Sequence, residues 1–128
     1  MKDIHIVGMI NREIFKVVTK DILTEEVIIT NERIEHIKNN HPGDYEGFGD
    51  YLKEMVESPD YILEANKPHS AMILKSFANG AELFKTIIRI KDSNDNHEYQ
   101  NSIITFIKIN QKEWNRLIKH KKVLYKYE

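Results

Sequence analysis

Apolar side chains recur along the chain at two different spacings, and the spacing changes near Pro59. Before that residue, the clearest run has the three- and four-residue spacing of one helix face, and Ser58-Pro59 ends it. Its members are Phe48, Tyr51, Leu52, Met55 and Val56. After Pro59, apolar and polar residues alternate, which is typical of strands with one buried face. The pattern therefore predicts helices first and an antiparallel β-meander second, which is the α+β class.

Four strands of the meander are predicted from this alternation, and turn residues separate them. Asn79-Gly80 favours a tight turn between the second and third strands, because both residues adopt positive φ readily. The polar run at 92–96, Asp-Ser-Asn-Asp-Asn, turns the chain before the fourth strand. The strands are expected near residues 60–65, 70–77, 82–91 and 101–109.

The N-terminal part predicts both strands and helices. The expected elements are a strand at 4–10, a short helix at 12–20, a strand at 27–30 and a helix directly after it. Gly8 indicates a bulge or a close approach within the first strand. Thr30 or Asn31 caps the helix that follows residue 30, and Ile34 and Ile37 form its apolar stripe.

The C-terminal part predicts one more helix. Asn110 caps it, and Glu113 three residues later completes a capping-box pattern. Trp114, Leu117 and Ile118 have the spacing of an inward face. Residues 123–127 are expected as a last short strand or as a docked tail, and the pattern leaves both open.

Composition places the chain among ordinary globular domains. Its 128 residues are enough for one domain, residues 1–128, with a core that needs no covalent staples. Hydrophobic residues make up 41% and charged residues 30%, which excludes disordered and fibrous classes. No apolar run approaches the roughly 18 residues of a membrane span. Zero cysteines exclude disulfides, thiolate metal sites and cysteine nucleophiles, and suit a cytoplasmic location.

Charge is unevenly distributed along the chain. The net charge is −1, but residues 105–128 contain seven basic and two acidic side chains. A basic end of this kind is typical of a surface that binds an anion, nucleic acid included. A solvated helix face gives the same pattern, so both interpretations stay open.

His36 and His41 are the residues with the clearest chemical potential. Histidine titrates near neutral pH, so a pair near one helix end is a candidate acid–base couple. Five positions separate them by about 140° around a helix, so they cannot share one face. Pro42 takes His41 out of the helix and lets it turn toward a cleft. In the structural alternative, His41 packs at the helix end and His36 is exposed.

A metal site has little support in the sequence. Two ligands on one helix are typically three or four residues apart, as in His-Glu-x-x-His, whereas His36 and His41 are five apart. Neither a Gly-rich phosphate loop nor a serine nucleophile motif occurs. We therefore expect no metal and no cofactor.

Three polar residues interrupt apolar strand patterns. Lys75 alternates with Ile73 and Phe77, and Arg89 ends a similar run. Such a cation either extends to water from a strand edge or reaches a phosphate across the sheet. Arg89 is the better phosphate ligand, because its planar fork donates two parallel hydrogen bonds. Thr105 lies in a very apolar strand, where simple strand propensity is the alternative explanation.

Five short segments, in order, carry a resemblance to a known family. They are the Gly8 region ahead of a helix, the Ile-Thr-Asn-Glu-Arg-Ile-Glu-His-Ile-Lys-Asn-Asn-His-Pro block at 29–42, the Ser-Pro-Asp-Tyr-Ile run at 58–62, the Ile-Ile-Thr-Phe run at 103–106, and the Leu-Tyr-Lys run at 124–126. Over nearly the whole chain the sequence resembles the phage-associated branch of the barnase–EndoU–colicin–RelE-like (BECR) nucleases. The resemblance implies N-terminal helices packed on an antiparallel sheet that holds the active site.

The resemblance further implies a metal-independent endoribonuclease of a phage or mobile element, acting as an effector or toxin. In this chemistry the RNA 2′-OH is the nucleophile, so the enzyme supplies a base, an acid and cations. The implied catalytic positions fall on His36, His41, Lys75, Arg89 and Thr105. The histidines share the acid and base roles in an order left open, the cations stabilise charge, and Thr105 donates a hydrogen bond to phosphate.

The expected partners are RNA and an inhibitor or immunity protein, without a membrane, and the oligomeric state is left open. The expected nucleic-acid-binding residues are Lys108, Lys119, Lys122, Tyr125 and Lys126, with Tyr125 and Tyr127 placed to stack bases. The competing hypothesis is a non-catalytic module of a phage or mobile element that binds nucleic acid or protein around a degenerate nuclease site. The two differ in whether the histidines and a strand cation meet in one cleft.

Overall fold

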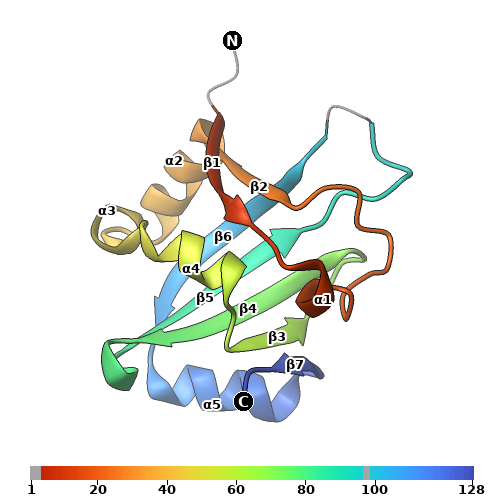
Figure 1. Ribbon diagram of the computed structural model, residues 1–128. Coiled ribbons are helices and arrows are strands. Elements are labelled where there is room, and N and C mark those ends of the chain that lie inside the picture. The colour runs from red at the N-terminus through yellow and green to blue at the C-terminus, as the bar shows by residue number, and fades with distance from the viewer. Residues whose placement is uncertain (1–3, 97–98) are drawn as a thin grey trace.

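A computed structural model describes residues 4–96 and 99–128. Within these ranges one seven-stranded sheet has the order β1-β2-β6-β5-β4-β3-β7 (Figure 1). The strands are β1 (Ile4–Met9), β2 (Glu26–Thr30), β3 (Tyr61–Glu64), β4 (Ser70–Phe77), β5 (Glu82–Arg89), β6 (Asn101–Ile109) and β7 (Val123–Lys126). The helices are α1 (Arg12–Phe15), α2 (Asn31–Asn40), α3 (Asp44–Phe48), α4 (Tyr51–Glu57) and α5 (Gln111–His120), with a 3₁₀ turn, η1, at Ala78–Gly80.

The meander predicted after Pro59 is confirmed. Strands β3, β4, β5 and β6 pair antiparallel in sequence order, and the turn at η1 has Asn79 and Gly80 at positive φ (56° and 90°). The final segment is a strand, because β7 pairs antiparallel with β3. The mixed α+β class therefore agrees with the sequence pattern.

One parallel pair in the sheet was not predicted. Strands β2 and β6 run parallel, with Val27 opposite Asn101 and Ile28 opposite Ser102. The Asn101 side chain is fully buried and donates to the backbone carbonyls of Thr24 (2.7 Å) and Glu26 (3.0 Å). A buried amide needs such partners, so Asn101 holds the two strands in register.

Two predicted helices were wrong in extent. The helix expected at 12–20 ends after one turn at Phe15, because the chain continues into the run Val17-Val18-Thr19, whose β-branched side chains lose rotamer freedom in a helix. The helix expected from Phe48 is divided into α3 and α4 at Gly49. A Cβ at Gly49 would lie 2.7 Å from the Tyr45 carbonyl oxygen, so the chain passes closely here.

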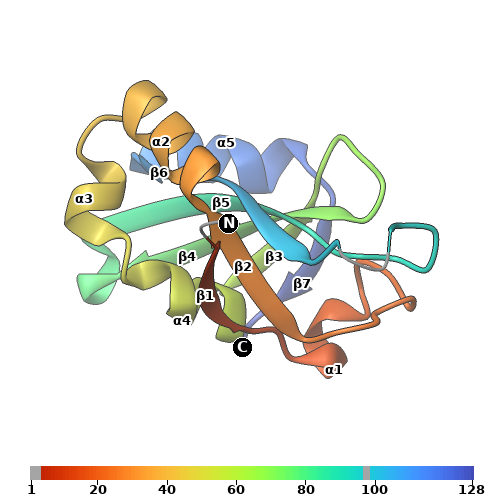
Figure 2. The ribbon, with the colours of Figure 1, turned by 90° about the horizontal axis from the view of Figure 1, so that it is seen from above.

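The sheet has a larger core on one face and a smaller core on the other. The larger core includes Ile37 of α2 and Met55 of α4, packed against buried strand residues such as Phe84 and Phe106. The smaller core lies under α5, where Leu117 contacts residues of β3 and β4. Figure 2 shows α4 and α5 on opposite sides of the sheet. No described residue of β1 or β2 belongs to the smaller core, so α5 covers only one half of its face.

Among the described residues, no helix has the length and apolar character needed to cross a membrane.

Candidate nucleic-acid site

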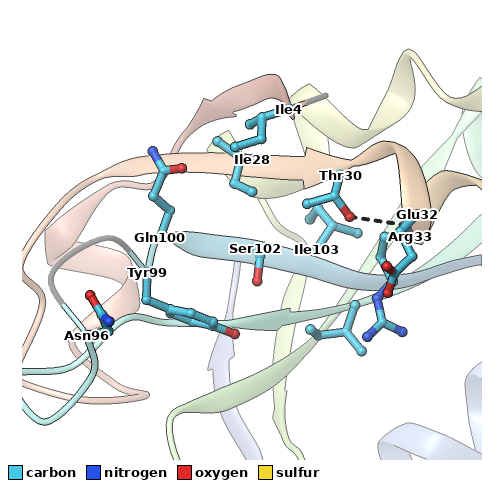
Figure 3. A pocket seen from close by; sticks show the side chains of 11 residues that line it. Ile4, Ile28, Thr30, Glu32, Arg33, Asn96, Tyr99, Gln100, Ser102 and Ile103 are labelled. Atoms are coloured by element: carbon cyan, nitrogen blue, oxygen red, sulfur yellow. Dashed lines mark hydrogen bonds between the residues drawn. The ribbon is translucent and has the colours of Figure 1, made fainter. Parts of the chain in front are cut away.

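A cavity of about 440 Å³ lies over the half of the sheet that α5 leaves uncovered (Figure 3). Thr30, Glu32 and Arg33 line one end of it, which we call the charged end. Asn96, Tyr99 and Gln100 line the other, which we call the aromatic end. Ser102 lies between the two ends in Figure 3.

Strand pairing explains which side chains reach this cavity. Ile28 and Ser102 are register partners, and residues two positions away on each strand project to the same face. Ser102 is also opposite Arg89, which alternates with Ile87, a residue packed against the α5 core. The cavity, Arg89 and α5 therefore share one face of the sheet.

The charged end is built at the junction of β2 and α2. Thr30 ends the strand and caps the helix, since its Oγ1 accepts a hydrogen bond from the Arg33 backbone N–H at 3.1 Å. The cap begins the helix immediately after the strand and brings the Glu32 and Arg33 side chains to the cavity, as Figure 3 shows. Within the described ranges, neither side chain forms a hydrogen bond or an ion pair, so both can bind a ligand.

The aromatic end is braced by Arg89, one of the predicted site residues. Its guanidinium donates two 3.0 Å hydrogen bonds to the carboxylate of Asp95 and lies 4.9 Å from the centre of the Tyr99 ring. The hydrogen bonds raise the pKa of Arg89 and lower the pKa of Asp95 from its ordinary value. Arg89 is therefore a fixed cation behind the wall of the cavity, already paired within the protein.

A third histidine near this end was missed from the sequence. His69 Nε2 lies 3.1 Å from a carboxylate oxygen of the buried Asp92, whose backbone N–H donates to Asp95 at 2.9 Å. The buried His69 Nδ1 has no partner among the described residues. His69 does not line the cavity. Its pair with Asp92 joins the loop between β3 and β4 to the loop after β5, whose Asp95 binds Arg89.

Lys75 lies on the other face of the sheet and does not join this site. It is opposite Phe84 of the larger core, and its side chain is only 11% exposed. Its ammonium donates to the Ser58 carbonyl at 2.6 Å and lies 3.3 Å from the Asp60 carboxylate. These contacts hold β4 against the segment after α4 and place Lys75 on the sheet face opposite to Arg89.

The two predicted histidines are separated along α2. His36 is exposed, and the Asn40 side-chain amide lies 3.2 Å from its Nε2. His41 caps the helix end through its backbone N–H, which donates to the Ile37 carbonyl at 2.8 Å. The rise of a helix places them about 7.5 Å apart along the axis, on different sides. His36 lies one turn beyond Glu32 and Arg33, whereas His41 lies about 12 Å along the helix from Arg33.

Thr105 lies on the α5 face, opposite Ile87, and its carbonyl accepts a hydrogen bond from the Thr86 hydroxyl. The register shift between Ile87 and Ile88 leaves Ile104 as an extra residue in β6. Ile104 lines the cavity and Thr105 does not. The five predicted catalytic residues therefore do not form one cluster.

The predicted nucleic-acid-binding residues are distributed over both faces. Lys108 lies with its ammonium 4.9 Å from the Phe48 ring, on the side of the larger core, and Tyr125 is half-buried against that same core. Lys126 lies over Tyr61 at 6.0 Å, on the side of α5. Lys119 and Lys122 are exposed near the end of α5. The predicted binding residues therefore include some on the α5 side, such as Lys126, and some on the side of the larger core, such as Lys108 and Tyr125.

Glu32, Arg33, Tyr99 and Ser102 line the cavity, and none of them was predicted as a site residue. Ser102 carried the same signal as Thr105, a polar residue within an apolar strand. Glu32 and Arg33 carried a weaker signal, since they form the first turn of a capped helix directly after a strand. Nothing local marked Tyr99, because its role depends on Arg89 ten residues earlier.

Among the residues that the structure describes, no group of three or more His, Cys, Asp and Glu side chains is placed to hold a metal ion.

Comparison with known families gives the class of protein. Residues 2–126 match the family described as phage-Barnase-EndoU-ColicinE5/D-RelE like nuclease2. The chain belongs to this phage-associated nuclease family, as the resemblance implied. Searches of curated proteins and of solved structures gave no match.

Proposed function

We propose that the protein is an endoribonuclease that cleaves RNA by attack of the 2′-OH, without a metal ion. The observation that carries the proposal is the charged end of the cavity. There, a chain of a nuclease family places Arg33 and Glu32 one helical turn from His36, and neither side chain is paired with another described residue. Each group has a place in the reaction.

Arg33 is the proposed ligand of the scissile phosphate. Its guanidinium can donate two parallel hydrogen bonds to phosphate oxygens, and the N-terminus of α2 adds partial positive charge at the same end. These donors would stabilise the charge that builds on the phosphorus oxygens in the transition state. Arg89 and Lys75 are already paired with carboxylates and supply charge less directly.

Glu32 and His36 are the proposed acid–base pair. Residues four positions apart share one face of a helix, so both side chains can reach a phosphate held by Arg33. One group takes the proton of the 2′-OH, and the other donates a proton to the departing 5′-oxygen. In this assignment Glu32 takes the role that was predicted for His41, because His41 lies beyond the far end of α2 from the cavity.

The test is cleavage of mixed RNA by purified protein, with and without a chelator. General acid or base catalysis contributes about 10² to 10⁴ in rate, so we expect His36→Ala to lose at least a hundredfold and the wild type to survive chelation. His41→Ala should lose less than tenfold. His120→Ala removes an exposed histidine of α5 and is the matched control. Circular dichroism should show an unchanged fold in all three variants.

The outcomes separate the possible mechanisms. Full loss with chelator would assign the chemistry to a metal. A loss in His41→Ala equal to that in His36→Ala would restore the original histidine pair. An unchanged rate in His36→Ala would remove the acid–base assignment.

A non-catalytic nucleic-acid-binding module is the second candidate. The observation that favours it is the separation of His36 from His41 and the prior pairing of both strand cations. This candidate predicts RNA binding without cleavage at any pH from 5 to 9. Detection of a 2′,3′-cyclic phosphate product in the wild type, lost in Arg33→Ala, would exclude it.

A further inference from the structure

We propose that the aromatic end of the cavity is a subsite for one unpaired nucleobase of the RNA strand whose phosphate lies at the charged end. This inference rests on the proposed function, since it takes RNA as the ligand. It goes beyond that function by assigning a base-recognition role to Tyr99 and Ser102. Neither residue takes part in the proposed chemistry.

Tyr99 supplies a stacking surface with one face already occupied. Its side chain lines the cavity, and the residue is 38% exposed. Arg89 lies over one face of the ring, 4.9 Å from its centre, and does not itself line the cavity. We assign the other face of the ring to the base. A base there would complete a layered stack of base, tyrosine and guanidinium, in which each contact is favourable.

The stack is held in place before a ligand arrives. The two hydrogen bonds from Arg89 to Asp95 fix the guanidinium, and the Tyr99 backbone N–H donates to the Asn96 carbonyl at 2.8 Å. A side chain that is already ordered loses less conformational entropy on binding than a mobile one. Tyr127 is 67% exposed, and its backbone N–H also donates, to the Asp60 carbonyl at 2.8 Å. Among the described residues no cation lies over its ring, so it is a weaker stacking surface.

A polar group beside the ring can hydrogen-bond to the edge of a base. The Ser102 hydroxyl projects toward the Tyr99 side of the cavity in Figure 3, and no described residue bonds to it. The Gln100 side chain extends away from the Tyr99 ring in Figure 3, and its amide lies 3.4 Å from a carboxylate oxygen of Glu26. A hydroxyl such as that of Ser102 hydrogen-bonds the edges of unstacked bases. Ile28 and Ile104 supply apolar surface between the two ends.

The two ends of the cavity are spaced for one strand. Gln100 lies two residues before Ser102, just ahead of β6. Thr30 lies two residues beyond Ile28, the partner of Ser102 on the parallel strand β2. At about 3.3 Å per residue the ends are roughly 13 Å apart, so a base and a phosphate of the same strand can occupy them together. A paired base cannot enter, because its edge and faces are covered in a duplex. The ligand is therefore single-stranded RNA or a loop.

The test is abasic scanning of a short single-stranded RNA with 2′-fluoro sugars, which lack the nucleophile and are not cleaved. Each base is removed in turn, and binding is measured by fluorescence anisotropy. We expect one position at which loss of the base weakens binding by about tenfold, as stacking on an aromatic side chain predicts. In Tyr99→Ala that position should lose its effect, whereas Tyr99→Phe and the control Tyr127→Ala should keep it.

A second variant keeps the test informative if Tyr99→Ala does not fold. Ser102→Leu leaves Tyr99 in place but fills the centre of the cavity, and it should abolish the same positional effect. A flat abasic profile in the wild type, or a profile unchanged in both Tyr99→Ala and Ser102→Leu, would overturn the subsite.

The binding and cleavage experiments distinguish a failure of the proposed subsite from a failure of the proposed nuclease function. Cleavage of ordinary RNA together with a flat abasic profile would leave the nuclease proposal standing and remove the subsite. A Tyr99-dependent position in a protein that cleaves no RNA would keep the subsite, as part of a binding module, and remove the nuclease proposal.

Discussion

The two halves of the sheet face that α5 approaches differ in what lies over them. Over β3 and β4, Leu117 closes a small apolar core with Leu63 and Leu74. Over β2 and the N-terminal part of β6, outside the core under α5, the cavity with Arg33 and Tyr99 occupies the space. The same alternating strands therefore produce a packed layer in one half and an open site in the other. The position of the site is decided by where the covering helix ends.

The two strand cations, Lys75 and Arg89, also differ in their surroundings. Lys75 and Arg89 both lie in strands among apolar neighbours, but the β4–β5 register pairs Lys75 with Phe84 and Arg89 with Ser70. Lys75 thus lies on the side of the larger core, where the Ser58 carbonyl accepts its hydrogen bond and the Glu54 and Asp60 carboxylates balance its charge. Arg89 faces the open half, where it supports Tyr99.

The largest effect expected from this comparison is on stability. Leu117 is 2% exposed and Ile4, which lines the cavity, is 38% exposed. Leu117→Ala should lower the free energy of unfolding by about 2–5 kcal/mol, because it leaves a void in a closed core. Ile4→Ala should cost less than about 1 kcal/mol, because its surroundings are already open. Urea unfolding of both variants measures the difference. Equal losses would show that the open half is packed as tightly as the covered half.

Much of the fold could be predicted because its signals are local. The bounds of β4 and β6 match the expected 70–77 and 101–109, since alternation and the Asn79-Gly80 turn define them without distant contacts. The parallel pairing of β2 with β6 could not be predicted. It depends on Asn101 reaching carbonyls more than seventy positions earlier in the chain.

The candidate site was predicted less completely than the fold. Alternation shows which residues share a strand face, but it does not show which face a helix will cover. The sequence therefore did not show that Arg89 and Lys75 lie on opposite faces, which follows from the β4–β5 register. His36 was identified by its titration range, whereas its nearest cavity neighbours, Glu32 and Arg33, had the appearance of ordinary surface residues in a first helical turn.

An intermediate effect, on RNA binding, is expected from charge reversal in the basic C-terminal part of the chain, which includes α5. Reversing Lys119, Lys121 and Lys122 to glutamate should weaken RNA binding by about tenfold and reduce the magnitude of the salt slope by about two, if all three contact phosphates of a single strand. Arg33→Ala should reduce that slope by less than one, because it removes one contact. Titrations at several salt concentrations measure both variants. An unchanged affinity and slope in the triple variant would make the lysines a solvated face and confine binding to the open half.

The smallest effect expected is a difference in acid sensitivity between two arginine–carboxylate pairs, one in each half. Arg89 bonds Asp95 in the open half, with side chains 27% and 17% exposed, and Arg116 bonds Glu113 on α5, with side chains 55% and 31% exposed. In each pair the hydrogen bonds from arginine lower the pKa of the carboxyl, from ordinary values of 3.8 and 4.5. The stabilisation is therefore complete above those ordinary values and is lost as the pH falls through the lowered folded-state pKa. Asp95→Asn should lower the melting temperature at pH 7 more than Glu113→Gln, because solvent screens the exposed pair more strongly. Both differences from the wild type should shrink toward pH 2. If Asp95→Asn had no effect at pH 7, the Arg89 brace would not stabilise the open half, and Tyr99 would be held by its backbone alone.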